Sequence, residues 1–300
     1  MASESRLSSA ALALGLALIA ADCGTDPSPI AIAETPAPPP RPAPVAAPFH
    51  LALEGAAVQG GLLFGTATGA ASLALDGNPV PLAPGGRFLL GFDRDHPASS
   101  LLEARSADGR TLSRAIAVAP RAWKIEQINI ARRPSGPTAD FLRLREGELA
   151  RIGAARASVP ASDGWRQSFV WPARGRISGV FGSQRVYRGE PASFHNGVDV
   201  AAGAGAPVVA PADGIVVLAG PPAFSLEGNL VIVAHGMGLT SAFLHLSQTL
   251  VRQGQPVRQG EIIGRVGASG RATGPHLHWG MRWGEARIDP QRLVSGQALP

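Results

Sequence analysis

The sequence has a single cysteine among its 300 residues, Cys23. One thiol cannot form an intramolecular disulfide, so disulfide-stapled folds are excluded. If Cys23 is removed together with an export signal, the rest of the chain carries no thiol. A thiol-free chain is compatible with an oxidising compartment.

Charged residues are also scarce, at 16% of the chain, and Lys124 is the one lysine among 27 basic residues. The formal net charge of +5 favours contact with polyanions such as nucleic acid, anionic lipid or anionic wall polymers. No dense basic run with interleaved aromatic residues is present, however. We therefore expect no nucleic-acid binding and interpret the charge as dispersed over a solvated surface.

The apolar run Ala10–Ala21 falls short of the ~20 residues that a membrane-spanning helix needs. Its length fits the hydrophobic region of a secretory signal, and Ala31-Ile32-Ala33 supplies a cleavage site. We predict a signal peptide over residues 1–33 and export to the periplasm or cell envelope. Contact with the membrane is expected only through an uncleaved signal or a lipid attached to Cys23. Asp22 argues against the lipid, because a small residue usually precedes a lipidated cysteine.

Glycine and proline, by contrast, are abundant at 37 and 27 residues, and this predicts a mainly β chain rich in turns. Residues 34–48 form a Pro-rich linker that favours polyproline II. Short alternating apolar segments over residues 49–130 predict a small β-sandwich-like domain, and Asp76-Gly77 and Asp108-Gly109 are hairpin signals within it.

A change of apolar period marks the segment from Thr138 to Ala157, where Phe141, Leu149 and Ile152 recur at helical spacing. We predict a helix there, within a connector over residues 131–165. Its charged residues are expected to form a solvated face.

Five of the seven histidines fall between positions 195 and 278. His276 and His278 alternate with apolar residues, and on a strand both imidazoles would point to one face. His195 and Asp199 are four residues apart and would share one side of an extended segment. Imidazole and carboxylate are good zinc ligands, and three protein ligands leave a catalytic zinc one open position.

The residues alone therefore predict a metal site made of His195, Asp199 and one histidine of the His276/His278 pair. The remaining histidine of the pair and His245 would move protons. His235, by contrast, is expected to end a strand and to hydrogen-bond locally.

Four segments, in their order and rough spacing, resemble the lysostaphin/LytM-type zinc metallopeptidases. They are Phe194–Ala201 (FHNGVDVA), Ala206–Val216 (APVVAPADGIV), Phe243–Ser247 (FLHLS) and Gly267–Trp279 (GASGRATGPHLHW). The resemblance covers about residues 166–290. It implies an antiparallel β-sheet domain with a groove over residues 166–300, preceded by the smaller β domain and the helical connector.

The same resemblance implies one Zn²⁺ held by His195, Asp199 and His278, with catalytic roles for His245 and His276. It implies a zinc metalloendopeptidase that hydrolyses peptide cross-links or stem peptides of bacterial peptidoglycan, with zinc-bound water as the nucleophile. The partners expected on this basis are peptidoglycan peptides.

Two alternative functions require a different set of residues. A non-catalytic LytM-type wall-binding protein that activates another hydrolase would be expected to lack at least one of the five positions, and all five are present. A structural zinc domain would need a closed four-ligand site. Gly280 stands where an acidic residue often follows the aromatic, and Gln184 and Val186–Ala192 resemble an inserted loop near the groove entrance. These departures leave the substrate preference open.

Overall fold

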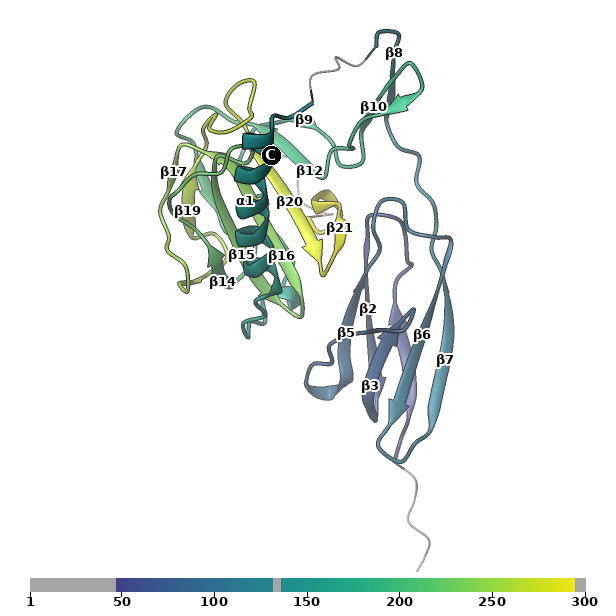
Figure 1. The fold of residues 1–300 in the computed structure, drawn as a ribbon. Coiled ribbons are helices and arrows are strands. Elements are labelled where there is room, and N and C mark those ends of the chain that lie inside the picture. Colours follow the sequence, from purple (N-terminus) through teal and green to yellow (C-terminus); the bar gives the residue numbers. More distant parts are fainter. Residues whose placement is uncertain (1–46, 132–135, 295–300) are drawn as a thin grey trace, which may run out of the picture. The chain divides into compact units, whose positions relative to one another are not determined.

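The computed structural model describes residues 47–131 and 136–294. Strands predominate in it (Figure 1), which confirms the mainly β fold that the sequence predicted. The predicted signal peptide and most of the predicted Pro-rich linker lie outside the described residues. Within those residues, no helix combines the length and the apolar character needed to cross a membrane.

The first region contains two small antiparallel sheets. One has the order β1 (His50–Glu54), β2 (Leu62–Thr68), β5 (Arg87–Gly91), and the other β4 (Asn78–Pro79), β3 (Ala70–Leu75), β6 (Ser99–Ser106), β7 (Thr111–Ala117). Buried residues of both sheets, such as Phe88 and Leu102, share one hydrophobic core, as in a sandwich. Asp76-Gly77 joins β3 to β4 with φ of 49° and 78°, as a type I′ turn requires.

A short hairpin interrupts the C-terminal half of the chain and pairs with a strand from the segment that follows the first region. Strand β10 (Gln184–Tyr187) pairs with β11 (Glu190–Pro191) and, in parallel, with β8 (Ile125–Ile128). The segment that the sequence presented as an inserted loop is therefore mostly a β-hairpin. Backbone pairing with a strand about 60 residues earlier gives it this order, and no local sequence signal reveals such a partner.

The second region is built on an eight-stranded antiparallel sheet with the order β18-β14-β15-β16-β20-β12-β9, in which β21 also pairs with β20. These strands are β9 (Arg176–Gly179), β12 (Gly197–Ala201), β14 (Gly214–Leu218), β15 (Asn229–Gly236), β16 (Leu239–Leu246), β18 (Pro256–Val257), β20 (Leu277–Trp283) and β21 (Ala286–Ile288). A smaller sheet contains β13 (Pro207–Val209), β19 (Ile262–Arg265) and β17 (Gln248–Thr249). Short 3-10 turns occupy Pro84–Gly86, Gly164–Arg166 and Pro290–Arg292.

The two faces of the large sheet follow from strand alternation. On β20, the side chains of Leu277, Trp279 and Met281 are at most 1% exposed and belong to the main hydrophobic core. His278 and Arg282 alternate with them and therefore lie on the opposite face. This opposite face carries the polar residues of the site described below.

Helix α1 (Ala139–Ala157) lies over β14 and β15 on that opposite face (Figure 1). It begins where the sequence predicted, because the hydroxyl of Thr138 accepts a hydrogen bond from the Phe141 N–H. Ile152 and Ala155 pack against Leu230, Ile232 and neighbouring apolar residues of the sheet.

The expectation that the charged residues of α1 form a solvated face is wrong for Arg145 and Glu148, and Arg156 also lines a cavity. Glu148 is buried and Arg145 is partly buried against the sheet, with side-chain exposures of 7% and 15%. Arg145 donates to both carboxylate oxygens of Glu227, and Glu148 accepts hydrogen bonds from the backbone and hydroxyl of Ser225. These partners offset the desolvation of the two charges, which is why they can face inward.

Candidate metal centre and active site

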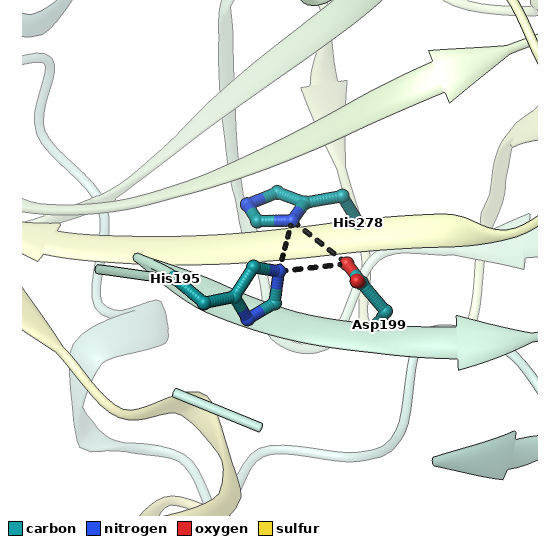
Figure 2. Close-up of side chains that lie close together, drawn as sticks. All are labelled: His195, Asp199 and His278. Carbon is teal, nitrogen blue, oxygen red and sulfur yellow. Dashed lines mark hydrogen bonds and ion pairs between the residues drawn. The ribbon is translucent and has the colours of Figure 1, made fainter. Parts of the chain in front are cut away.

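Three of the predicted site residues converge on one point (Figure 2). The Asp199 Oδ1 atom lies 3.0 Å from His195 Nε2 and 2.9 Å from His278 Nδ1, and the two nitrogens are 3.1 Å apart. Within the described part of the chain, these three residues are the one group whose His, Cys, Asp or Glu atoms are close enough to share a metal ion.

The pairing of β12 with β20 sets this geometry. Asp199 and His278 are directly opposite one another in the antiparallel register, and His195 precedes β12 by two residues. Directly opposite residues have their Cβ atoms ~4.5–5.5 Å apart, which brings a carboxylate and an imidazole into contact. The imidazole of His278 also needs Gly197, because a Cβ there would lie 2.7 Å from its Nε2.

Electrostatics at the cluster favour an anionic aspartate. Burial alone would raise the pKa of Asp199, but hydrogen bonds from His195 and His278 hold that pKa well below its ordinary value. Burial alone would lower the pKa of His195, and the hydrogen bond and charge of Asp199 instead raise it. Burial lowers the pKa of His278, which favours the neutral imidazole that a metal requires.

The donor set fits a zinc ion. Two imidazole nitrogens and one carboxylate oxygen are typical zinc ligands, and bonds of ~2.0–2.1 Å in a tetrahedron place ligand atoms about 3.3 Å apart. The observed separations are 2.9–3.1 Å. The Nδ1 of His195 lies 3.2 Å from the carbonyl of Val180, to which it can donate, so Nε2 would be able to bind a metal in place of its contact with Asp199.

His245 and His276 lie beside this cluster. The ring centroid of His245 is 4.9 Å from that of His276 and 6.2 Å from that of His278, and His276 Nε2 is 3.9 Å from Asp199 Oδ1. Each ring donates its Nδ1 proton to a backbone carbonyl, His245 to Ser269 and His276 to Gly274. The Nε2 atoms are thereby left available for proton transfer.

A backbone irregularity brings His245 to this face. Phe243 belongs to the main core, so strict alternation would direct residue 245 into the core as well, but Leu246 lies there instead. His245 has φ of +64°, in the left-handed region, and its N–H bonds to the carbonyl of Glu227 instead of continuing the ladder with β20. Such strained residues cluster at functional sites.

His235 is not part of the site, as the sequence indicated. It ends β15 on the core face, with no measurable exposure. Its Nδ1 donates to the carbonyl of Asp213 at 2.8 Å, and its Nε2 lies 2.9 Å from the hydroxyl of Ser241. Both nitrogens are satisfied, so neither is free for a metal or a substrate.

Two hollows meet at the cluster. A cleft of about 950 Å³ is lined by His195 and Asp199 together with β9, β10 and Arg271. On the other side of His278, a cavity of about 260 Å³ lies between α1 and the sheet. Its lining includes Arg156, Arg282 and Arg287, which sequence reasoning missed because residues on a helix and two strands meet there through tertiary packing.

Comparison with known proteins supports the assignment of a family. The model of peptidase family M23 matches residues 193–290. A Vibrio cholerae protein named peptidoglycan DD-endopeptidase ShyA is 39% identical over 114 residues, which are 38% of this chain and 26% of that protein. A Neisseria meningitidis protein named DD-carboxypeptidase/endopeptidase Mpg is 43% identical over 120 residues, 39% of this chain and 25% of that protein.

The Caulobacter vibrioides cell division protein DipM is 39% identical over 128 residues, 42% of this chain and 20% of that protein. The chain thus spans about a quarter or less of the length of these relatives. A crystal structure of a Pseudomonas aeruginosa protein described as an M23 peptidase matches this chain over a much larger share of both chains. It has a TM-score of 0.60 and 30% identity, and the match covers 80% of this chain and 96% of that one. The chain belongs to peptidase family M23.

Proposed function

We propose that this chain is a zinc-dependent metalloendopeptidase that hydrolyses peptide bonds of bacterial peptidoglycan. The convergence of His195, Asp199 and His278 carries the proposal, because their donor atoms fit one Zn²⁺ beside a cleft and next to two further imidazoles. The name of the Vibrio relative, peptidoglycan DD-endopeptidase, supports peptidoglycan as the substrate class, and the name of the Neisseria relative supports an endopeptidase.

In this proposal, zinc when bound would polarise the scissile carbonyl and lower the pKa of water. His245 would move the proton at its Nε2, since its Nδ1 is held by the Ser269 carbonyl. His276 Nε2 would hydrogen-bond the oxyanion or share the proton transfer. Burial lowers the pKa of His245, so its ring is neutral and able to accept a proton near neutral pH.

The same proposal includes the cellular location and the domain organisation of the enzyme. Export to the periplasm or cell envelope follows from a peptidoglycan substrate, and the division into 1–33, 34–48, 49–130, 131–165 and 166–300 remains our prediction of the domain organisation.

The test is release of peptide fragments from purified peptidoglycan by the chain, with zinc content determined on the same sample. We expect cleavage that stops on chelation and in the His276→Ala variant. Bound zinc without any cleavage would contradict the enzyme and favour a wall-binding protein that activates another hydrolase. A folded chain with neither zinc nor cleavage would overturn the metal site as well.

A further inference from the structure

The cavity between α1 and the large sheet has two chemically different ends. His278 and Asn196 line the end next to the candidate metal centre, and Arg156, Arg282 and Arg287 line the cavity as well. Space for the cavity exists because its floor contains the small residue pair Ala242 and Gly280, which lie directly opposite in the β16–β20 register.

The three arginines are held close together in spite of their like charge. Arg282 and Arg287 are direct cross-strand partners on β20 and β21, an arrangement that costs free energy for like charges. Arg156 comes from the last turn of α1. Burial, followed by the charges of Arg282 and Arg287, lowers the pKa of Arg156 to about 10.

The protein supplies little negative charge to compensate these three arginines. Arg282 pairs with Glu285, whose side chain is 97% exposed, and Arg287 approaches Asp93 only to 3.8 Å. The Nε of Arg287 is buried without a hydrogen-bond partner, and Arg156 has no acceptor in the part of the chain that the structure describes. Glu227 is the one acidic residue of the cavity lining, and Arg145 binds both of its oxygens.

We propose that Arg156, Arg282 and Arg287 form a binding site for a carboxylate of the peptide substrate. Guanidinium groups bind carboxylates through paired, charge-assisted hydrogen bonds, and the buried Arg287 Nε is a donor still lacking an acceptor. The inference rests on the proposed peptidase function and names the substrate class more closely: a peptide that carries a free carboxylate some distance from the bond that is cut.

The spacing suits such a peptide. His278 and Arg282 are four residues apart on β20, so their Cα atoms are separated by ~13 Å at ~3.3 Å per residue. An extended substrate of about four residues would therefore reach from the candidate metal centre to the arginines. Arg156 makes α1 a wall of this site, in addition to any role in linking domains.

The test compares peptide binding before and after the carboxylates are removed. Soluble peptidoglycan peptides, released by a muramidase, are used in their native form and after carbodiimide coupling to ammonia, which converts carboxylates to carboxamides. Binding to the zinc-loaded full chain carrying His245→Ala is measured by titration calorimetry. We expect amidation to weaken binding by about tenfold or more, as for a charged hydrogen-bonded contact.

Adding Arg282→Gln and Arg287→Gln should abolish the difference between native and amidated peptides, and Arg156→Gln should reduce it. Arg258→Gln is the matched control, since it removes the charge of an exposed arginine outside the cavity and should keep the full difference. Circular dichroism melting verifies that each variant is folded. Equal binding of both peptide forms by the parent chain, no binding of the native form, or a difference that survives in the arginine variants would each overturn the inference.

Failure of the proposed function has a different signature. Carboxylate-dependent binding by a chain that releases no fragments from peptidoglycan would leave the arginine site standing and overturn the peptidase. Fragment release without any preference for carboxylates would support the peptidase and overturn the arginine site.

Discussion

Both faces of the large sheet carry histidines, and the two faces use them differently. On the core face, His235 is fully buried and both ring nitrogens have partners, the Asp213 carbonyl and the Ser241 hydroxyl. On the opposite face, His195, His245 and His276 each bind a backbone carbonyl through Nδ1. Their second nitrogen is left facing other polar groups or open to solvent.

What the second ring nitrogen faces, more than burial, separates a functional imidazole from a structural one in this sheet. His278 is nearly as buried as a core residue, at 7% exposure, yet its Nδ1 meets a carboxylate and a second imidazole. A chain that places three such donor atoms within about 3 Å leaves them poorly satisfied unless a cation or proton lies among them.

The largest effect is expected from the metal ligands. His278→Ala or Asp199→Ala should abolish zinc retention and reduce peptidoglycan cleavage at least about a thousandfold, since the metal supplies several kcal/mol of transition-state stabilisation. Zinc content by atomic absorption and fragment release, measured on one sample, would verify this. A variant that loses zinc but keeps its turnover would show that the cluster is not catalytic.

A large loss of turnover with zinc retained is expected from His245→Ala. Positioned acid–base groups contribute about 10²–10⁴-fold, and His245 contributes no atom to the three-residue cluster. The readouts are again fragment release and bound zinc. Unchanged turnover would remove His245 from the mechanism, and lost zinc would make it a ligand.

On the core face, Trp279→Ala should cost about 3–5 kcal/mol of unfolding free energy, because the indole is fully buried and donates to Ser241. His276, which precedes β20 and faces the site, offers the control: His276→Ala should change the stability of the zinc-free chain by no more than about 1 kcal/mol. Denaturant unfolding measures both. Comparable losses for the two variants would contradict the assignment of the faces.

His235 predicts a smaller, pH-dependent effect. Burial lowers its folded pKa from 6.5 to about 4, so between these values the unfolded chain binds the proton and the folded chain does not. Falling pH should therefore cost the zinc-free fold up to about 3 kcal/mol between pH 6.5 and 4 through this residue alone. Unfolding measured across this range should show a shallower pH dependence in His235→Gln, and an identical dependence would contradict a buried neutral imidazole.

The sequence predicted much of this arrangement because strands have a short, regular period. The alternation around His276 and His278 placed both imidazoles on one face, and the Asp-Gly pairs located two hairpins. The helix α1 followed from the change of apolar period that begins at Thr138. These features depend on residues close together in the chain, so they can be recognised without the fold.

Features that depend on long-range packing escaped prediction. The left-handed backbone of His245 reverses the alternation that its sequence suggests, and Glu227 accounts for the buried guanidinium of Arg145 only once the fold brings the two together. The arginines of the cavity come from α1, β20 and β21, and no spacing in the sequence relates them. The carbonyls of Val180 and Ser269 that orient His195 and His245 carry no sequence signal at all, because every residue has a carbonyl.

The most direct test of a catalytic zinc on the polar face is a zinc titration of the chelator-treated chain, followed by the rate of fragment release from peptidoglycan. We predict no release without metal, and a rate that rises linearly and levels off at one zinc per chain. Full activity in the metal-free chain, or a rate that zinc leaves unchanged, would contradict the account.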